Sequence, residues 1–249
     1  DKTDFRAEGD FILDSAAISS FRIKNGLNAG FNIDLEANES LLTIKNGALR
    51  TDNYRFGISG TYNYTGLINL IIKGENLDVS EISSLLNKNY RIEKYGFRPS
   101  GKFDAICTIT GPLTKTANPD ISVDFSLSEG ALTREGKTVG IDQLKIDGLF
   151  GNKAITDTSR AGIIGLSEIS FLLGGSQYKG SLSARLTDTV FLELFLNAAI
   201  KPSDLKDFFN LEAIKTTSGS VNADLKLNGS FVAGSKISPL ILLSQNSFS

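Results

Sequence analysis

The side chains that most often carry catalysis or bind metals are scarce in this chain. It has no His, which removes the commonest general base and the commonest nitrogen ligand of metal ions. Its single cysteine, Cys107, excludes an internal disulfide and a zinc site built from several thiolates. Ser, Lys, Asp and Glu would suffice for a Ser-Lys nucleophile or a pair of catalytic carboxylates, but no spacing singles out any of them. We therefore expect no catalytic residue, no metal site, no cofactor and no enzymatic activity.

Sequence motifs for bound ions and phosphates are also absent. A calcium loop needs closely spaced carboxylates around a Gly, and a phosphate loop needs a Gly-rich turn that ends in Lys and Ser or Thr. The pair formed by Gly174 and Gly175 lacks that ending. The net charge is −2, and Lys and Arg form no cluster along the sequence, so we expect no nucleic-acid partner.

One block of sequence occurs twice. In each copy a strongly apolar strand leads into a short helix and then into an alternating strand that starts with Ser-Gly. The first copy covers residues 67–86 and 100–113, and the second covers residues 191–209 and 218–231. An internal repeat of this kind predicts an architecture built from similar units.

The repeat divides the chain into two expected units. The first, residues 1–113, contains a helix near residues 78–87, and the second, residues 114–249, contains a helix near residues 202–210. We expect the two units to form one continuous elongated domain. Because the sequence contains no Met, we also expect the chain to be a processed form or a piece of a longer protein.

Alternation of apolar and polar residues dominates the sequence and predicts strands with one buried and one wetter face. It is clearest in residues 31–36, 121–128 and 221–228. Pairs of a polar residue and Gly are typical of hairpin turns between such strands. Six pairs fit this pattern: Asn25-Gly26, Asn46-Gly47, Glu129-Gly130, Glu135-Gly136, Asp147-Gly148 and Asn228-Gly229. The fold class that follows is mainly β, with antiparallel strands.

Two of the expected strands, residues 67–72 and 191–196, are apolar on both faces. Each has a single polar residue, Asn69 in the first and Glu193 at the matching position of the second. Such a strand either lies between a core and a covering helix, or has one face in the core and the other lining an apolar groove. The uninterrupted faces, our candidates for lipid contact or for the core directly behind it, are Ile68, Leu70 and Ile72 in the first copy and Leu192, Leu194 and Leu196 in the second.

The two expected helices are short and carry recognisable ends. Asp78 is placed to cap the first helix, with Glu81 three residues later. Its apolar stripe is Ile82, Leu85 and Leu86. Pro202 fits the first position of the second helix, whose stripe is Leu205, Phe208 and Phe209. Because each helix buries one stripe only, we expect both to cover an end or an edge of a curved sheet.

Several turn and strand motifs follow one another in a distinctive order. A Gly-Pro-Leu turn at residues 111–113 and a Gly-Ala-Leu at residues 130–132 precede an Ile-Asp-x-Leu-x-Ile-x-Gly segment at residues 141–148. A short Leu/Phe helix at residues 205–209 and an Asn-Gly-Ser-Phe at residues 228–231 complete the pattern. This order resembles the C-terminal repeating region of AsmA-like proteins, and the resemblance covers roughly residues 54–231.

This resemblance implies a long, curved antiparallel sheet whose concave side is an apolar groove. AsmA-like proteins are anchored in the inner membrane of Gram-negative bacteria by an N-terminal helix and extend through the periplasm. They are linked to phospholipid transport and to outer-membrane assembly, which implies phospholipids and envelope assembly proteins as partners. No run in the chain reaches the roughly 18 apolar residues that a membrane-spanning helix needs, so the anchor is expected in the parent protein only.

A second hypothesis is a repeating extracellular β module that binds glycans or adheres to surfaces. Such a site would present exposed aromatic rings, and the absence of Trp speaks against stacking on sugars. A continuous apolar concavity would favour the lipid hypothesis, whereas a shallow polar cleft with Tyr rings would favour the glycan hypothesis.

Overall fold

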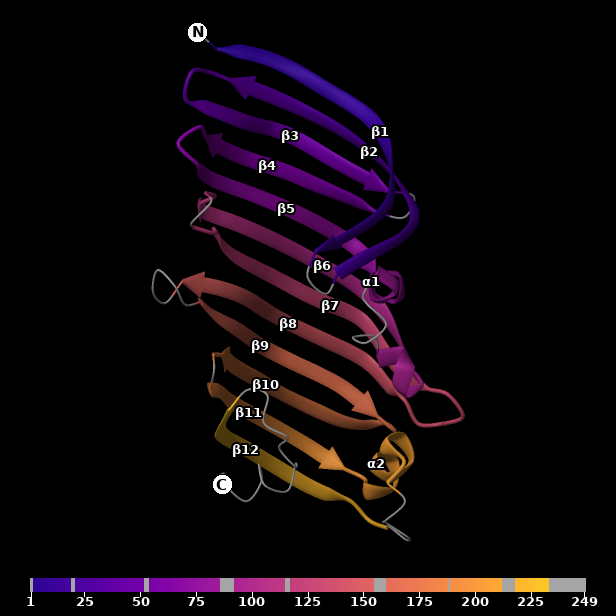
Figure 1. Cartoon of the computed structure of the whole chain (residues 1–249). Coiled ribbons are helices and arrows are strands. Elements are labelled where there is room, and N and C mark those ends of the chain that lie inside the picture. The colour runs from indigo at the N-terminus through magenta and orange to yellow at the C-terminus, as the bar shows by residue number, and fades with distance from the viewer. Residues whose placement is uncertain are drawn as a thin grey trace. The chain divides into compact units, whose positions relative to one another are not determined.

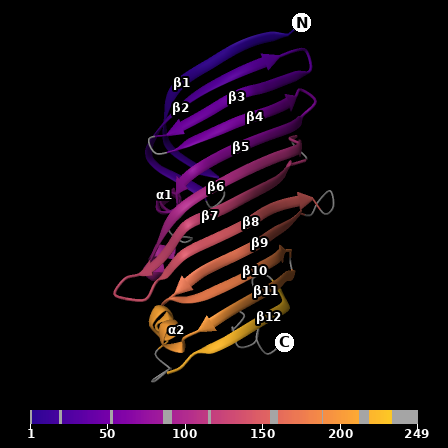
Figure 2. The same cartoon turned by 180° about the vertical axis from the view of Figure 1, so that it is seen from behind.

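The computed structural model describes residues 2–18, 21–51, 54–85, 92–114, 117–154, 160–187, 189–211 and 218–232. Within them the chain is mainly β, with twelve strands, two short α-helices and one 3₁₀ turn. The strands follow one another in the sheet in chain order from β1 to β12 (Figures 1 and 2). The sheet is antiparallel and does not close on itself. The predicted fold class, a mainly β protein with an open antiparallel sheet, is confirmed.

The chain forms two compact units, which we describe separately. Unit 1 comprises Asp1–Arg91 and Phe103–Phe125, and unit 2 comprises Ile92–Lys102 and Ser126–Ser249. Strands β6 (Phe97–Pro112) and β7 (Asp120–Arg134) each contribute residues to both units. The division into sequence repeats at residues 1–113 and 114–249 stays a prediction.

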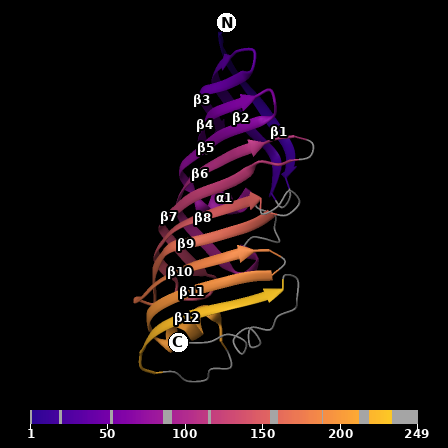
Figure 3. The ribbon, with the colours of Figure 1, turned by 90° about the vertical axis from the view of Figure 1, so that its left-hand side faces the viewer.

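Unit 1 is built on five successive strands and a short helix. The apolar and polar residues of these strands alternate, which is the pattern that a sheet with two different faces requires. The strands curve within the unit (Figure 3). Their bounds are β1 Thr3–Ile18, β2 Phe21–Ala37, β3 Leu41–Thr51, β4 Arg55–Asn63 and β5 Leu67–Asp78, and the helix is α1 Val79–Leu85.

Unit 2 also contains a short helix, which lies directly before its last strand in the sequence. The 3₁₀ turn Ile92–Tyr95 precedes β6. The remaining elements are β8 Ile141–Ala154, β9 Arg160–Leu173, β10 Ser176–Leu186, β11 Thr189–Ile200, α2 Pro202–Phe209 and β12 Val221–Val232.

The prediction of six hairpin turns at polar-Gly pairs is wrong for five of them. Only Glu135-Gly136 forms a turn, whereas the other five pairs lie inside strands. Three of those five coincide with a shift in the pairing of neighbouring strands, as at Asn46-Gly47. A Cβ on Gly47 would lie 2.9 Å from the carbonyl oxygen of Ile58, so Gly allows the two backbones to approach. These pairs therefore mark irregular or close-packed positions, and the strands are longer than expected.

Gly60 and Gly57, both in β4, provide a matched test of this role. The φ of Gly60 is +146°, and a Cβ there would overlap the carbonyl oxygen of Asn69. The nearest atom to a Cβ on Gly57 is the Cβ of Lys73 at 4.0 Å. We expect Gly60→Ala to lower the free energy of unfolding by about 1–3 kcal/mol. Gly57→Ala should leave it unchanged or raise it slightly, and chemical denaturation measures both.

The largest closed core of the described residues lies in unit 2, under α2. Its buried members are Leu173, Tyr178, Ala198 and Phe208, and the Phe208 ring packs 5.5 Å from that of Phe97. Pro202 begins the helix, as predicted. Phe208 is 1% exposed, but Phe209, predicted to share the buried stripe, is 50% exposed, so that assignment is wrong.

Helix α1 begins as the sequence predicts. Asp78 Oδ1 accepts hydrogen bonds from the backbone N–H of Ser80, at 2.9 Å, and from its hydroxyl, at 2.6 Å. These bonds satisfy one of the amides that a helix start leaves unpaired. Ile82 is half-buried, and Leu86, the last residue of the predicted stripe, lies outside the described residues.

The two adjacent phenylalanines of α2 allow a controlled test of the core. Phe208→Ala removes a fully buried ring, and we expect it to reduce the free energy of unfolding by about 3–5 kcal/mol. Phe209→Ala deletes the same atoms from a half-exposed position and should cost far less. Thermal and denaturant unfolding of both variants would show the difference. Equal losses would mean that the ring of Phe208 is not the centre of this core.

Candidate functional site

The three candidate residues of the first copy lie in β5 on one face of unit 1. Ile68, Leu70 and Ile72 occupy alternate positions of the strand and are all half-buried. The strand assignment that placed them on a common face is therefore correct. Their cross-strand partners in β4 are Tyr62, Gly60 and Ile58.

The same face continues as an apolar surface over the other strands of unit 1. The cross-strand partners of these residues extend the surface from β4 to β3, and then to β2 and β1, and none of them is charged. We call this surface the inner face of unit 1. Besides the residues of β4 and β5, it consists of Leu42, Ile44 and Leu49 of β3, Phe31, Ile33 and Leu35 of β2, and Phe5 and Ala7 of β1.

The candidate residues of the second copy form the matching surface in unit 2. Leu192, Leu194 and Leu196 alternate along β11 and are half-buried. We call the surface that contains them the inner face of unit 2. Their partners are Ala184, Leu182 and Gly180 in β10, and Gly229, Leu227 and Leu225 in β12.

Each helix covers one end of the inner face of its own unit. In unit 2, Leu196 packs against the core cluster that contains Phe208 of α2. In unit 1, α1 contacts both β2 and β5, two strands that β3 and β4 separate in the sheet. Tyr54, which precedes β4, lies beside Glu81 of α1. The sheet of unit 1 therefore bends around its inner face.

The opposite faces of β5 and β11 are not covered. Leu67 is 52% exposed, and Phe191 and Phe195 are 50% and 46% exposed. A strand held between a core and a covering helix would bury these side chains. The interpretation in which a helix covers that face is therefore wrong, and the apolar groove stays a prediction.

Titratable groups near the inner faces are kept neutral by burial. Burial and the nearby carboxylate of Glu81 raise the pKa of the Tyr54 hydroxyl. Burial and the charge of Asp204 raise the pKa of Tyr178. Burial also raises the pKa of the Cys107 thiol. These shifts favour uncharged forms at neutral pH, and none of the three groups gains the reactivity that a lowered pKa would give.

The described residues contain neither a metal-binding group nor a membrane-spanning helix. In the described part of the chain no group of three or more Cys, Asp or Glu side chains is arranged to hold a metal ion. Among the same residues no helix has the length and apolarity to cross a membrane. No family model, no curated protein and no solved structure matches the chain.

The outer face of unit 1 carries a group of cations that the sequence pattern did not reveal. Arg50, Arg55 and Lys73 line a hollow there, together with polar side chains. They come from three different strands, so no cluster is visible along the sequence. The statement that Lys and Arg form no cluster is correct for the sequence and wrong for the folded unit.

An ion-pair network lies next to this hollow. Glu36 contacts the ammonium groups of Lys2, at 2.8 Å, and Lys45, at 2.9 Å, and Lys45 also contacts Asp4 at 2.8 Å. Hydrogen bonds from Lys2 and then from Lys45 lower the pKa of Glu36 from 4.5 to about 2. Hydrogen bonds from Lys45 to Asp4, and then to Glu36, raise the pKa of Lys45.

The depressed pKa of Glu36 predicts the direction of its pH dependence. Its ion pairs stabilise the fold above pH 4.5, and that contribution is lost as the pH falls through about 2. We expect a carboxyl NMR titration of Glu36 to have its midpoint near 2, and near 4.5 in the Lys2→Met, Lys45→Met double variant. Lys179→Met, an exposed residue of unit 2, is the control. If the midpoint of Glu36 is the same in the wild type and in the double variant, the two lysines do not lower its pKa.

Proposed function

We propose that the chain is a non-enzymatic segment of an AsmA-like envelope protein of Gram-negative bacteria. In this proposal the inner faces of its two units shield the acyl chains of phospholipids during transport toward the outer membrane. The segment works in the periplasm, and the parent protein is anchored in the inner membrane. Envelope assembly proteins are its expected protein partners.

The observation that carries the proposal is the state of the inner-face side chains. They are apolar over several successive strands, and the six candidate residues of β5 and β11 are half-buried, whereas Ala184 and Leu227 beside β11 are buried. A closed core would bury Leu70 and Leu194 fully. An ordinary water-exposed face of a sheet would carry charged and polar side chains. A surface of this kind gains free energy when it contacts another apolar group.

Acyl chains suit this surface because they need no directional contacts. Each methylene removed from water contributes about 0.8 kcal/mol, so ten methylenes contribute roughly 8 kcal/mol before the entropic cost of binding. The inner-face residues of β5 and β11 offer no charged group that would select a polar headgroup. The proposal therefore predicts binding by chain length and little discrimination among headgroups on these faces.

Neighbouring residues of β11 supply the decisive test. Leu194 lies on the inner face, and Phe195 lies on the opposite face, 46% exposed. We expect Leu194→Glu to weaken binding of a fluorescent fatty-acid probe at least about tenfold, equivalent to about 1.4 kcal/mol. Phe195→Glu adds the same charge outside the proposed site and should bind the probe normally. Leu70→Glu and Asn69→Glu form the corresponding pair in unit 1.

Melting curves distinguish the possible failures. A carboxylate on a half-open surface stays hydrated, so both β11 variants should keep a cooperative transition. If Leu194→Glu no longer melts cooperatively, Leu194 belongs to a core and the site assignment fails. If it melts normally and binds the probe like the wild type, the lipid proposal fails. Binding of neutral oligosaccharides by both variants would then favour the glycan-binding alternative.

A further inference from the structure

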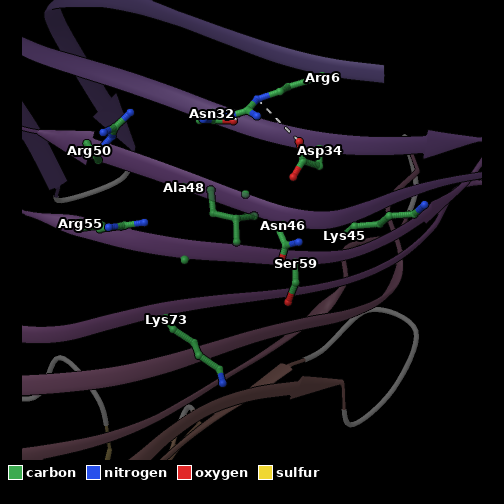
Figure 4. A pocket seen from close by; sticks show the side chains of 13 residues that line it. Arg6, Asn32, Asp34, Lys45, Asn46, Ala48, Arg50, Arg55, Ser59 and Lys73 are labelled. Carbon is green, nitrogen blue, oxygen red and sulfur yellow. Dashed lines mark hydrogen bonds and ion pairs between the residues drawn. The ribbon is translucent and has the colours of Figure 1, made fainter. Parts of the chain in front are cut away.

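The hollow on the outer face of unit 1 has a floor of small residues. Ala48 of β3 pairs with Gly57 of β4, and both side-chain positions leave space above the sheet. A Cβ on Gly57 would meet only the Cβ of Lys73, at 4.0 Å. The space has a volume of about 540 Å³ and opens to solvent (Figure 4). It is therefore large enough for a polyatomic anion.

Three cations surround this floor. Arg50 pairs directly with Arg55 across β3 and β4, and Lys73 pairs with Gly57, which places it diagonal to Arg55. Facing residues of paired strands have Cα atoms about 4.5–5.5 Å apart. Like charges at directly opposite positions of two paired strands destabilise a sheet. The arrangement therefore costs stability unless an anion lies between the charges.

Other charges of the unit do not neutralise these three. Arg6 and Lys45, which also line the hollow, contact the carboxylates of Asp34 and Glu36. In the part of the chain that the structure describes, Arg50, Arg55 and Lys73 have no carboxylate within 4 Å.

Three carboxylates lie near these cations without pairing with them. Glu75 follows Gly74, the partner of Phe56, so it lies on the Arg55 side of β5, but no ion pair joins it to Arg55 or Lys73. Asp34 is the single carboxylate among the residues that line the hollow, and it already contacts Arg6. Asp10 lies in the same cross-strand row as Arg50, beyond Gly30, but forms no ion pair with it. The three cations are thus available to a ligand.

The charge of the hollow opposes that of the whole chain. Five cations and one carboxylate line it, whereas the chain carries a net charge of −2. A local positive potential on an acidic protein attracts anions to one place and not to the whole surface. The remaining polar groups at the rim include Asn46 and Ser59, which can donate neutral hydrogen bonds.

We propose that this hollow binds a terminal phosphate group, either inorganic phosphate or a phosphate monoester, which carries about 1.5 to 2 negative charges near neutral pH. Arg50 and Arg55 supply planar forks that match phosphate oxygens, and Lys73 supplies a point charge. The group is either free or the headgroup of a lipid such as phosphatidic acid. The site lies on the outer face and is independent of the shielding of acyl chains by the inner face.

The test uses the full chain and two probes. The first is inorganic phosphate, measured by calorimetry, and the second is phosphatidylcholine vesicles with and without phosphatidic acid. The Arg50→Gln, Arg55→Gln double variant should lose at least about tenfold in affinity. The Arg98→Gln, Arg185→Gln double variant removes two exposed Arg side chains from unit 2 and should bind like the wild type.

A third variant tests whether binding depends on the shape of the hollow or only on its positive charge. Gly57→Leu fills the hollow without changing any charge, and its position has neither a positive φ nor a close neighbour. We expect it to reduce binding as strongly as the double Gln variant. Because Arg50 and Arg55 repel each other, the double Gln variant should also melt no lower than the wild type.

The outcomes are distinct. Loss of phosphate binding in the hollow variants supports a site for the free group. Loss of vesicle binding that depends on phosphatidic acid supports the lipid headgroup as its source. Failure of both probes to bind the wild type overturns the proposal. Equal losses in the unit 2 control, or full binding by Gly57→Leu, overturn it as well, since general electrostatic attraction would then explain the data.

Discussion

The pairing of each strand with its neighbour in sequence is the constraint on which the rest of the structure depends. Alternate side chains of a strand point to opposite faces, so one register fixes the face of every residue in a ladder. In unit 1 this register places Ile58 and Leu70 on the inner face and Arg50 and Arg55 on the outer face. A shift of one residue would exchange the two surfaces. The apolar face and the basic hollow are thus two results of the same hydrogen bonds.

Glycine and small residues permit this register at particular places. Gly60 is opposite Leu70 and has a positive φ, which lets the neighbouring backbone approach. A Cβ on Gly57 would meet only the Cβ of Lys73, at 4.0 Å, so this position leaves space above the sheet. The same residue type therefore serves close packing at one position of β4 and a hollow at another. Only the neighbouring strands distinguish the two roles.

Local patterns in the sequence predict much of this structure, and features set by distant strands escape them. Alternation predicts the mainly β class and the shared face of Ile68, Leu70 and Ile72, because the period belongs to the strand itself. Asp78 predicts the start of α1 for the same reason. The pair Asn46-Gly47 fails as a turn signal, since its role depends on the approach of Ile58. Arg50, Arg55 and Lys73 come together only through strand register.

The agreement between chain order and sheet order has a consequence for how the protein is made. Because each strand pairs with the strand before it and the strand after it, no pairing has to wait for a distant part of the chain. Folding that relies on near neighbours closes short loops first and avoids long entropic searches. Hairpins can therefore add one by one to a growing edge while the chain emerges from the ribosome or a translocation channel.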